Sequence, residues 1–173
     1  MPLPVLPPDL AAHHTRINRH QARYKYRDQG FDLNLVRQIK AYYYACISFV
    51  DYQIGRIVTA LEKSGQLDNT LILFSSDHGE YLGDYQSFGK RCMHDAATKV
   101  PLIARLPGTF ASGGRCARPA SLVDILPTIC AAAGAETGCD GVRLDQLARG
   151  RVRRDAVFSQ HEHGADADYA ILT

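Results

Sequence analysis

The feature that most constrains this 173-residue chain is a long helical pattern that leads through a short turn into an apolar strand. Apolar residues recur at steps of three and four between Leu35 and Leu61, which is the spacing of one helix face. Asp32 is a suitable N-cap, and Gly65 suits the left-handed residue that ends a helix. The pattern therefore predicts one helix over about residues 32–64 with a buried apolar stripe.

The segment after this helix predicts the strands of a sheet. Thr70–Ser75 is a continuous β-prone run, typical of a strand buried on both faces in a parallel sheet. A second short strand is expected over Val100–Arg105. A helix is expected within Ser121–Ala133, and it starts near Leu126 or bends there because Pro127 does not suit a helix interior. A helix followed by a buried strand indicates an α/β fold.

Two further strands, Asp155–Gln160 and Tyr169–Leu172, are expected to form a small antiparallel extension at the C-terminal end. The chain then divides into three parts. These are an irregular N-terminal arm (1–30), the core of the domain (31–135) and a C-terminal extension (136–173).

Composition excludes several functional classes. With 46% hydrophobic and 22% charged residues the chain is globular, and a net charge of +2 argues against a nucleic-acid partner. No window approaches the roughly 18 apolar residues of a membrane span, so we expect no membrane partner. The first eight residues contain four prolines and no basic residue, so they do not resemble a signal peptide.

The five cysteines do not support a zinc cluster or a thioredoxin-type site. Their number is odd and no pair has C-x-x-C spacing. Cys46 and Cys130 lie in apolar helical patterns and are expected to be inert core thiols. A reducing compartment, and hence a cytoplasmic location, is the simplest expectation.

The chemistry is expected in the polar segment Ser76–Lys99, which directly follows the first strand. Ligands bind beyond the carboxyl ends of strands in open α/β sheets, and Asp77 and His78 lie at such an end. A carboxylate and an imidazole can share one divalent ion if the chain turns, and Gly79 would permit that turn. By itself the dipeptide is a weak signal, and an N-cap beside an ordinary surface histidine is the alternative.

The region Tyr43–Gly108 resembles the C-terminal half of the sulfatase catalytic domain, in the alkaline phosphatase superfamily. Order and spacing agree with that family over several pieces, and looser similarity extends to residue 158. The matching pieces are Ala45–Asp51, Asp68–Glu80, Leu82–Asp84, Phe88–Arg91, Val100–Ile103, Leu106–Gly108 and Ser121–Ile129.

The resemblance implies a partial alkaline-phosphatase-like α/β/α sandwich with a mixed sheet, and hydrolysis of small-molecule sulfate esters. Asp77 and His78 match metal ligands, and the ion would be Ca²⁺ or Mn²⁺. Lys90 matches the lysine that contacts the sulfate group and steadies the leaving oxygen, so it is the candidate catalytic and substrate-binding residue. His94 is a further candidate substrate contact, but it stands where many members have tyrosine, and a plain surface residue is the alternative.

The family's nucleophile motif, Cys- or Ser-x-Pro/Ala-x-Arg, and its two early metal-binding acids are missing from this sequence. The run Cys139–Arg143 has the Cys and Arg spacing but carries glycine in the middle, so we interpret it as a coincidence. We therefore expect a fragment whose missing N-terminal half lies upstream of Met1. We expect this fragment to bind metal weakly and to be inactive alone.

Three functions stay open at this point. The first is a sulfatase-like hydrolase. The second is a phosphonate monoester or phosphodiester hydrolase of the same superfamily, which the Asp-His pair favours. The third is a non-catalytic module that forms a homo-oligomer or pairs with another chain through an exposed strand edge and apolar patch.

Overall fold

The computed structural model describes residues 2–4, 6–14, 18–19, 32–161 and 168–172. The chain forms two compact units, Met1–Ala60 with His78–Val100, and Leu61–Asp77 with Pro101–Thr173. The division into residues 1–30, 31–135 and 136–173 follows sequence patterns rather than contacts, and it stays a prediction.

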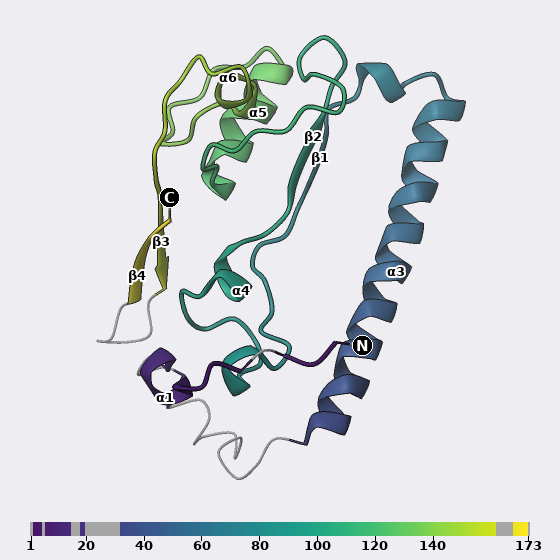
Figure 1. Cartoon of the computed structure of the whole chain (residues 1–173). Helices are drawn as coiled ribbons and strands as arrows, with labels where there is room; N and C mark the ends of the chain where they lie inside the picture. Colours follow the sequence, from purple (N-terminus) through teal and green to yellow (C-terminus); the bar gives the residue numbers. More distant parts are fainter. Residues whose placement is uncertain (1, 5, 15–17, 20–31, 162–167, 173) are drawn as a thin grey trace. The chain divides into compact units, whose positions relative to one another are not determined.

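Helix α3 confirms the long helical pattern, since it runs without interruption from Leu33 to Lys63 (Figure 1). The Asp32 carboxylate accepts hydrogen bonds from the backbone N–H groups of Asn34 at 2.8 Å and Leu35 at 3.3 Å, as an N-cap does. At the other end Gly65 has φ +70°, and the Gln66 amide donates to the Leu61 carbonyl at 2.9 Å. Both predicted ends of the helix are thus confirmed.

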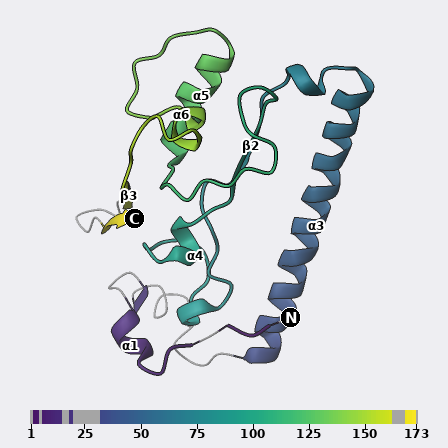
Figure 2. The same ribbon diagram turned by 45° about the horizontal axis from the view of Figure 1, so that its top comes forward.

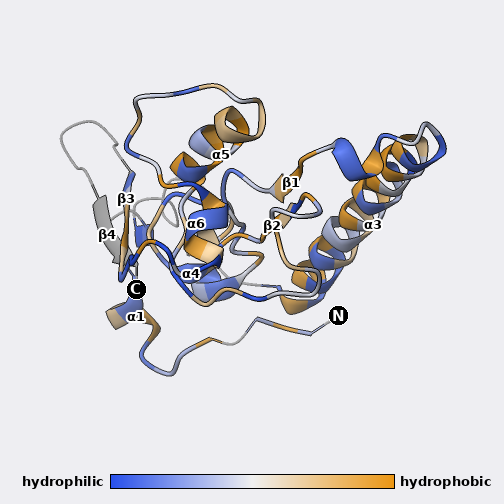
Figure 3. Cartoon of the chain, turned by 90° about the horizontal axis from the view of Figure 1, so that it is seen from above, coloured by the Kyte–Doolittle hydropathy of each residue, from blue (hydrophilic) through white to orange (hydrophobic). Residues whose placement is uncertain are grey.

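The burial expected for this helix is not observed. Within α3 only Val36 and Lys40 are buried, whereas Phe49 is 65% exposed and Val50 is 51% exposed. Apolar and polar residues alternate around the helix as the pattern predicted (Figure 3). Amphipathic spacing shows that a face is suited to contact, but it does not show that this chain supplies the contact.

The remaining part of the first unit is built from short elements. These are helix α1 (Leu10–His13), the 3₁₀ helix η3 (Asp84–Gln86) and helix α4 (Asp95–Thr98). Their buried centre is formed by Tyr81, Cys92 and Ala97. The prediction of core thiols was therefore wrong in its residues, because Cys46 is exposed and Cys130 only half-buried, while Cys92 is buried.

In the second unit, the 3₁₀ helix η2 (Leu67–Asn69) precedes strand β1 (Ile72–Ser75), which pairs with strand β2 (Leu102–Arg105) (Figures 1 and 2). The strands are antiparallel, with Ile72 opposite Arg105 and Ser75 opposite Leu102. The predicted strands exist, but the parallel direction expected for the first is not that of its described pairing. A continuous apolar run indicates burial rather than direction.

In the second unit a helix starts close to Pro127, as the sequence predicted. A 3₁₀ turn η4 (Leu122–Asp124) leads into α5 (Ile125–Ala132), so Pro127 lies in the first turn, where its missing N–H costs no helical bond. Helix α6 (Leu144–Ala148) follows. The Asp124 carboxylate is fully buried and binds the Ser121 and Val142 amides and the Arg154 guanidinium.

The chain ends in an antiparallel pair of strands, β3 (Val157–His161) and β4 (Asp168–Leu172), as predicted. Among the helices that the structure describes, none combines the length and the apolar character that crossing a membrane requires.

Candidate active site

The candidate site begins where β1 ends. Asp77 is exposed, and the boundary between the two units falls between Asp77 and His78. The segment from His78 to Val100 belongs to the first unit and carries the predicted residues His78, Lys90 and His94.

The imidazole of His78 is held in one tautomer. Its Nδ1 lies 2.8 Å from the Gly79 carbonyl oxygen, and because a carbonyl only accepts, Nδ1 carries the hydrogen. In the neutral ring this leaves the lone pair on Nε2, which faces the Lys90 ammonium in direct contact. The structure thus brings together two predicted site residues, twelve positions apart, and it presents a cation to the nitrogen that would ligate a metal.

Gly79 fixes the start of the loop by close packing rather than by a turn. Its amide donates to the Ala97 carbonyl at 2.8 Å, and a Cβ at this position would overlap the Ala96 carbonyl oxygen. Gly79 is not among the positive-φ glycines, so the reason given for it from the sequence was wrong. Glycine is required here because two backbones approach each other.

Glu80 joins the two ends of the loop that precedes Lys90. One carboxylate oxygen accepts the Gly89 amide at 2.6 Å and the Leu82 amide at 3.3 Å. The Tyr81 amide donates to the Gly89 carbonyl at 3.0 Å. Gly89 is thus held on both sides, directly before the candidate catalytic lysine.

A buried chain of hydrogen bonds supports the same loop. The Tyr81 hydroxyl lies 2.7 Å from both the Cys92 Sγ and the His94 Nδ1, and the Asn18 amide donates to the same sulfur at 3.1 Å. A consistent order of donors runs from the Cys92 thiol to the Tyr81 hydroxyl to the His94 ring. These contacts make His94 part of the internal support of the loop; its predicted role in substrate binding stays a prediction.

Both rings of this chain of bonds are kept neutral. Burial raises the pKa of Tyr81 well above its usual range, and the hydrogen bond to Cys92 adds to the shift. Burial lowers the pKa of His94, and the nearby His13 and His14 act in the same direction. Neutral His94 stacks on Tyr85 with ring centroids 4.3 Å apart.

The backbone of the loop is strained. Leu82, Tyr85 and Gln86 have φ values of 47°, 51° and 51°, in the left-handed region that non-glycine residues rarely adopt. Each such residue costs on the order of 1–3 kcal/mol, so surrounding contacts must hold it. Tyr85 is held by its stacking on His94 and by the His14 ring, whose Nε2 lies 2.7 Å from the Tyr85 carbonyl.

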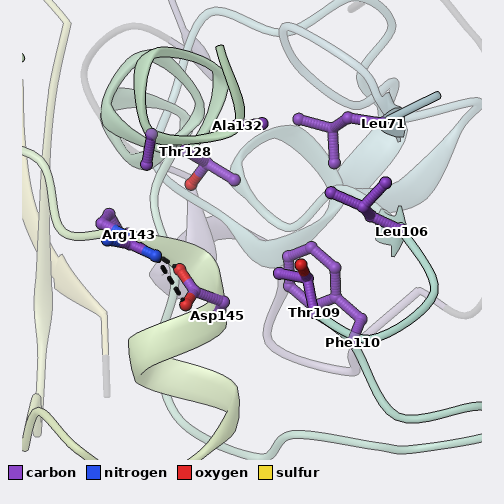
Figure 4. Close-up of a pocket in the computed structure, with 9 residues that line it drawn as sticks. Leu71, Leu106, Thr109, Phe110, Thr128, Ala132, Arg143 and Asp145 are labelled. Atoms are coloured by element: carbon purple, nitrogen blue, oxygen red, sulfur yellow. Dashed lines mark hydrogen bonds and ion pairs between the residues drawn. The ribbon is translucent and has the colours of Figure 1, made fainter. Parts of the chain in front are cut away.

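Two other places do not offer a comparable site. In the described ranges, no three His, Cys, Asp or Glu side chains gather so as to hold a metal by themselves. A small pocket of the second unit lies between Leu71, Phe110 and Thr128, but its one cation, Arg143, is bound by both Asp145 oxygens at 2.9 Å (Figure 4). This pairing also occupies the arginine of the Cys139–Arg143 run.

Comparison with known proteins decides the family. The sulfatase family model matches residues 10–135. The chain belongs to the sulfatase family. An arylsulfatase of Clostridium perfringens is 33% identical over 162 residues, which cover 84% of this chain and 34% of that protein. A choline-sulfatase of Rhizobium meliloti is 34% identical over 151 residues, covering 83% of this chain and 29% of the relative.

Solved structures show the fold of this sulfatase-family chain. The phosphonate monoester hydrolase of Silicibacter pomeroyi superposes with a TM-score of 0.81 at 31% identity, covering 92% of this chain and 34% of that one. The α/β fold is therefore that of the alkaline phosphatase superfamily, as the resemblance implied. The chain spans about a third of the length of these relatives.

Sequence reasoning selected His78 and Lys90, which the structure brings into contact, but it missed most of the loop's internal support. From the sequence, Glu80 could orient the loop by hydrogen bonds, but a solvated charge was the default expectation. Asn18, Tyr81 and Cys92 were not selected. A signal was present in part, because Glu80 and Gly89 belong to the pieces that resemble the family. The bond between the Glu80 side chain and the Gly89 backbone depends on how the loop closes, and no spacing rule predicts that.

Proposed function

We propose that this chain forms the part of a sulfatase-type hydrolase that binds the sulfate group of an ester and contributes two metal ligands. The observation that carries the proposal is the contact between the Lys90 ammonium and the Nε2 atom of a tautomerically fixed His78. In this proposal the cation for the anionic ester lies beside the nitrogen for the metal, and Lys90 would leave the Nε2 lone pair when that atom ligates a metal. Family membership supports the same reading.

Each residue has a distinct role in this proposal. Asp77 and His78 would hold a divalent cation, and the sulfatase family in general depends on such an ion. When bound, the ion supplies Lewis-acid polarisation of an ester oxygen. Lys90 binds and orients the sulfate group and neutralises charge on the leaving oxygen. The nucleophile is assigned to no residue of this chain.

The donor set fits the expected ions. Hard oxygen donors such as Asp77 suit Ca²⁺, and the imidazole of His78 suits Mn²⁺ as well. Two ligands are few for either ion, since Ca²⁺ takes six to eight. We therefore propose that this chain alone binds the ion weakly.

Mn²⁺ titration tests the metal site directly. The paramagnetic ion broadens nuclear resonances near it, so the His78 ring signals should broaden at lower Mn²⁺ concentration than those of His94, the internal control. Replacing His78→Ala should leave the His94 signals unaffected at that concentration. Broadening that starts at His94, or that is equal at both rings, would remove His78 from the site.

A phosphonate monoester hydrolase is the second candidate, and the superposition on such an enzyme favours it. The two candidates differ in the anionic group of the ester, sulfate or phosphonate, and not in the cationic residues that would bind it. A chimera in which this chain replaces the matching part of the Clostridium arylsulfatase separates them through parallel assays of an aryl sulfate and an aryl phosphonate. Faster turnover of the phosphonate would overturn the sulfatase proposal.

The partner and location are also proposals. We propose that the remaining part of a sulfatase domain, in the same polypeptide or another, completes the site, and that the protein is cytoplasmic. The small net charge of +2 supports a small-molecule ester rather than nucleic acid as the ligand. Fractionation of cells that express the protein would test the location, and a membrane-bound or secreted product would contradict it.

A further inference from the structure

Lys90 is an exposed residue on a loop, and such side chains are usually mobile. A lysine has four rotatable bonds, so a defined position of its ammonium requires at least a fixed backbone. The question is therefore what fixes the backbone at residues 89–90.

Hydrogen bonds to the N–H and the carbonyl of Gly89 fix this backbone. Its N–H is taken by the Glu80 carboxylate at 2.6 Å, and its carbonyl by the Tyr81 amide at 3.0 Å. The Lys90 carbonyl accepts the Cys92 amide at 3.0 Å. Of these three bonds, only the first depends on a side chain, and it is charge-assisted and short.

The loop would not keep this form by local preference. Gly89 itself has φ +86°, and the enclosed residues Leu82, Tyr85 and Gln86 lie in the left-handed region. A backbone of this kind relaxes unless its ends are held together. Glu80 binds the residues at both ends of the enclosed stretch, since its carboxylate also accepts the Leu82 amide at 3.3 Å.

We infer that Glu80 is a positioning residue: its carboxylate holds the Gly89 amide and so sets the place of the Lys90 ammonium beside His78. Glu80 acts through the backbone and does not touch the ester. The importance of this for sulfate binding rests on the proposed function, but the position of Lys90 does not.

The test uses the whole chain in solution, without metal or ester. Nuclear Overhauser effects between the Lys90 Hε protons and the His78 ring protons report the distance directly. They should be present in the natural chain, lost in Glu80→Ala and retained in Glu80→Gln, which keeps an oxygen that can accept the Gly89 amide. Asp84→Ala is the matched control, because it removes a carboxylate from the same loop. Unchanged effects in a folded Glu80→Ala variant would overturn the inference.

Two additions keep the outcome decisive. If Glu80→Ala does not fold, the exchange of the Gly89 amide hydrogen is compared between the natural chain and Glu80→Gln. The inference would be overturned if the natural chain protected this amide as well as Glu80→Gln does and yet showed no Overhauser effects between Lys90 and His78. Inorganic sulfate is then titrated, and Glu80→Ala should bind it about tenfold more weakly, the loss expected for one charge-assisted hydrogen bond. A natural chain that binds no sulfate would contradict the proposed function while leaving the positioning result intact.

Discussion

The two glycines Gly55 and Gly79 show how differently one residue type is used in this chain. A Cβ on Gly79 would overlap the Ala96 carbonyl oxygen, whereas a Cβ on Gly55, within α3, would meet nothing within 4 Å. The loop needs its glycine for space, and the helix does not. The same substitution is therefore expected to have opposite effects at the two positions.

Gly79→Ala should lower the free energy of unfolding by about 2–3 kcal/mol, because the backbone must move to admit the methyl group. Gly55→Ala should raise it by about 0.5–1 kcal/mol through the better helix propensity of alanine. Urea denaturation followed by circular dichroism measures both. An equal effect at the two positions would contradict the close approach at Gly79.

Individual residues were predictable where the signal is local. Asp32 and Gly65 end α3 as expected, because capping depends on a few neighbouring backbone groups. His78 and Lys90 were selected through their place in a family pattern, and their roles stay a prediction. The packing reason for Gly79 was not accessible, since it depends on a segment seventeen residues further along the chain.

The 3₁₀ turn η4, which leads into helix α5, has a capping box formed by Ser121 and the buried acid Asp124. Asp124 accepts two backbone amides and pairs with Arg154 at 2.5 Å, all within the second unit. Asp124→Ala leaves the mostly buried arginine unpaired and should cost about 3–5 kcal/mol of unfolding free energy.

Asp155→Ala is the matched control for Asp124→Ala, because it breaks an exposed ion pair with Arg153. Such pairs contribute little, so we expect a change below about 1 kcal/mol. Thermal or urea denaturation of the two variants compares them. A similar loss in both would show that the Asp124 network does not support the helix.

The folded chain is expected to lose stability in acid because of His94. The pKa of His94 is lowered in the folded chain, so the unfolded chain binds a proton at higher pH than the folded one. Stability is therefore complete above the ordinary histidine pKa of about 6.5 and falls as the pH drops toward the lowered value. Protonated His94 would also face His13 and His14.

Urea denaturation at pH 7.5 and pH 5 measures this loss, and His94→Gln should reduce it because glutamine does not titrate. A pH dependence that is unchanged in His94→Gln would assign the effect to other groups. The amide is a suitable replacement, since its oxygen can still accept the Tyr81 hydroxyl.

At the scale of the whole molecule, the main property is apolar surface that the described part of the chain leaves exposed. Ile47, Val50 and Ile57 lie along one side of α3 and are 50%, 51% and 62% exposed. Isolated exposed apolar residues are common, but a continuous stripe of them indicates a contact surface. The periodicity of the sequence predicted the apolar face that carries Val50 and Ile57, but it predicted the burial of that face wrongly. The spacing is a property of the helix, whereas the burial depends on a second surface.

We expect the purified chain to associate through this stripe. Ile47→Glu should shift the mass measured by light scattering toward the monomer, since it places a charge in the contact. Arg56→Gln, on the other side of the helix, changes the net charge by the same amount and should have no effect. A natural chain that is monomeric at all concentrations would contradict the prediction.

The buried thiol of Cys92 can report the rate at which the segment around it opens. Three other thiols, Cys46, Cys116 and Cys139, are exposed and should react with a thiol reagent at once, whereas Cys92 can react only when the segment around Tyr81 swings open. The slowest phase of such labelling would then report the rate at which the loop around Lys90 opens, with no substitution made in the protein.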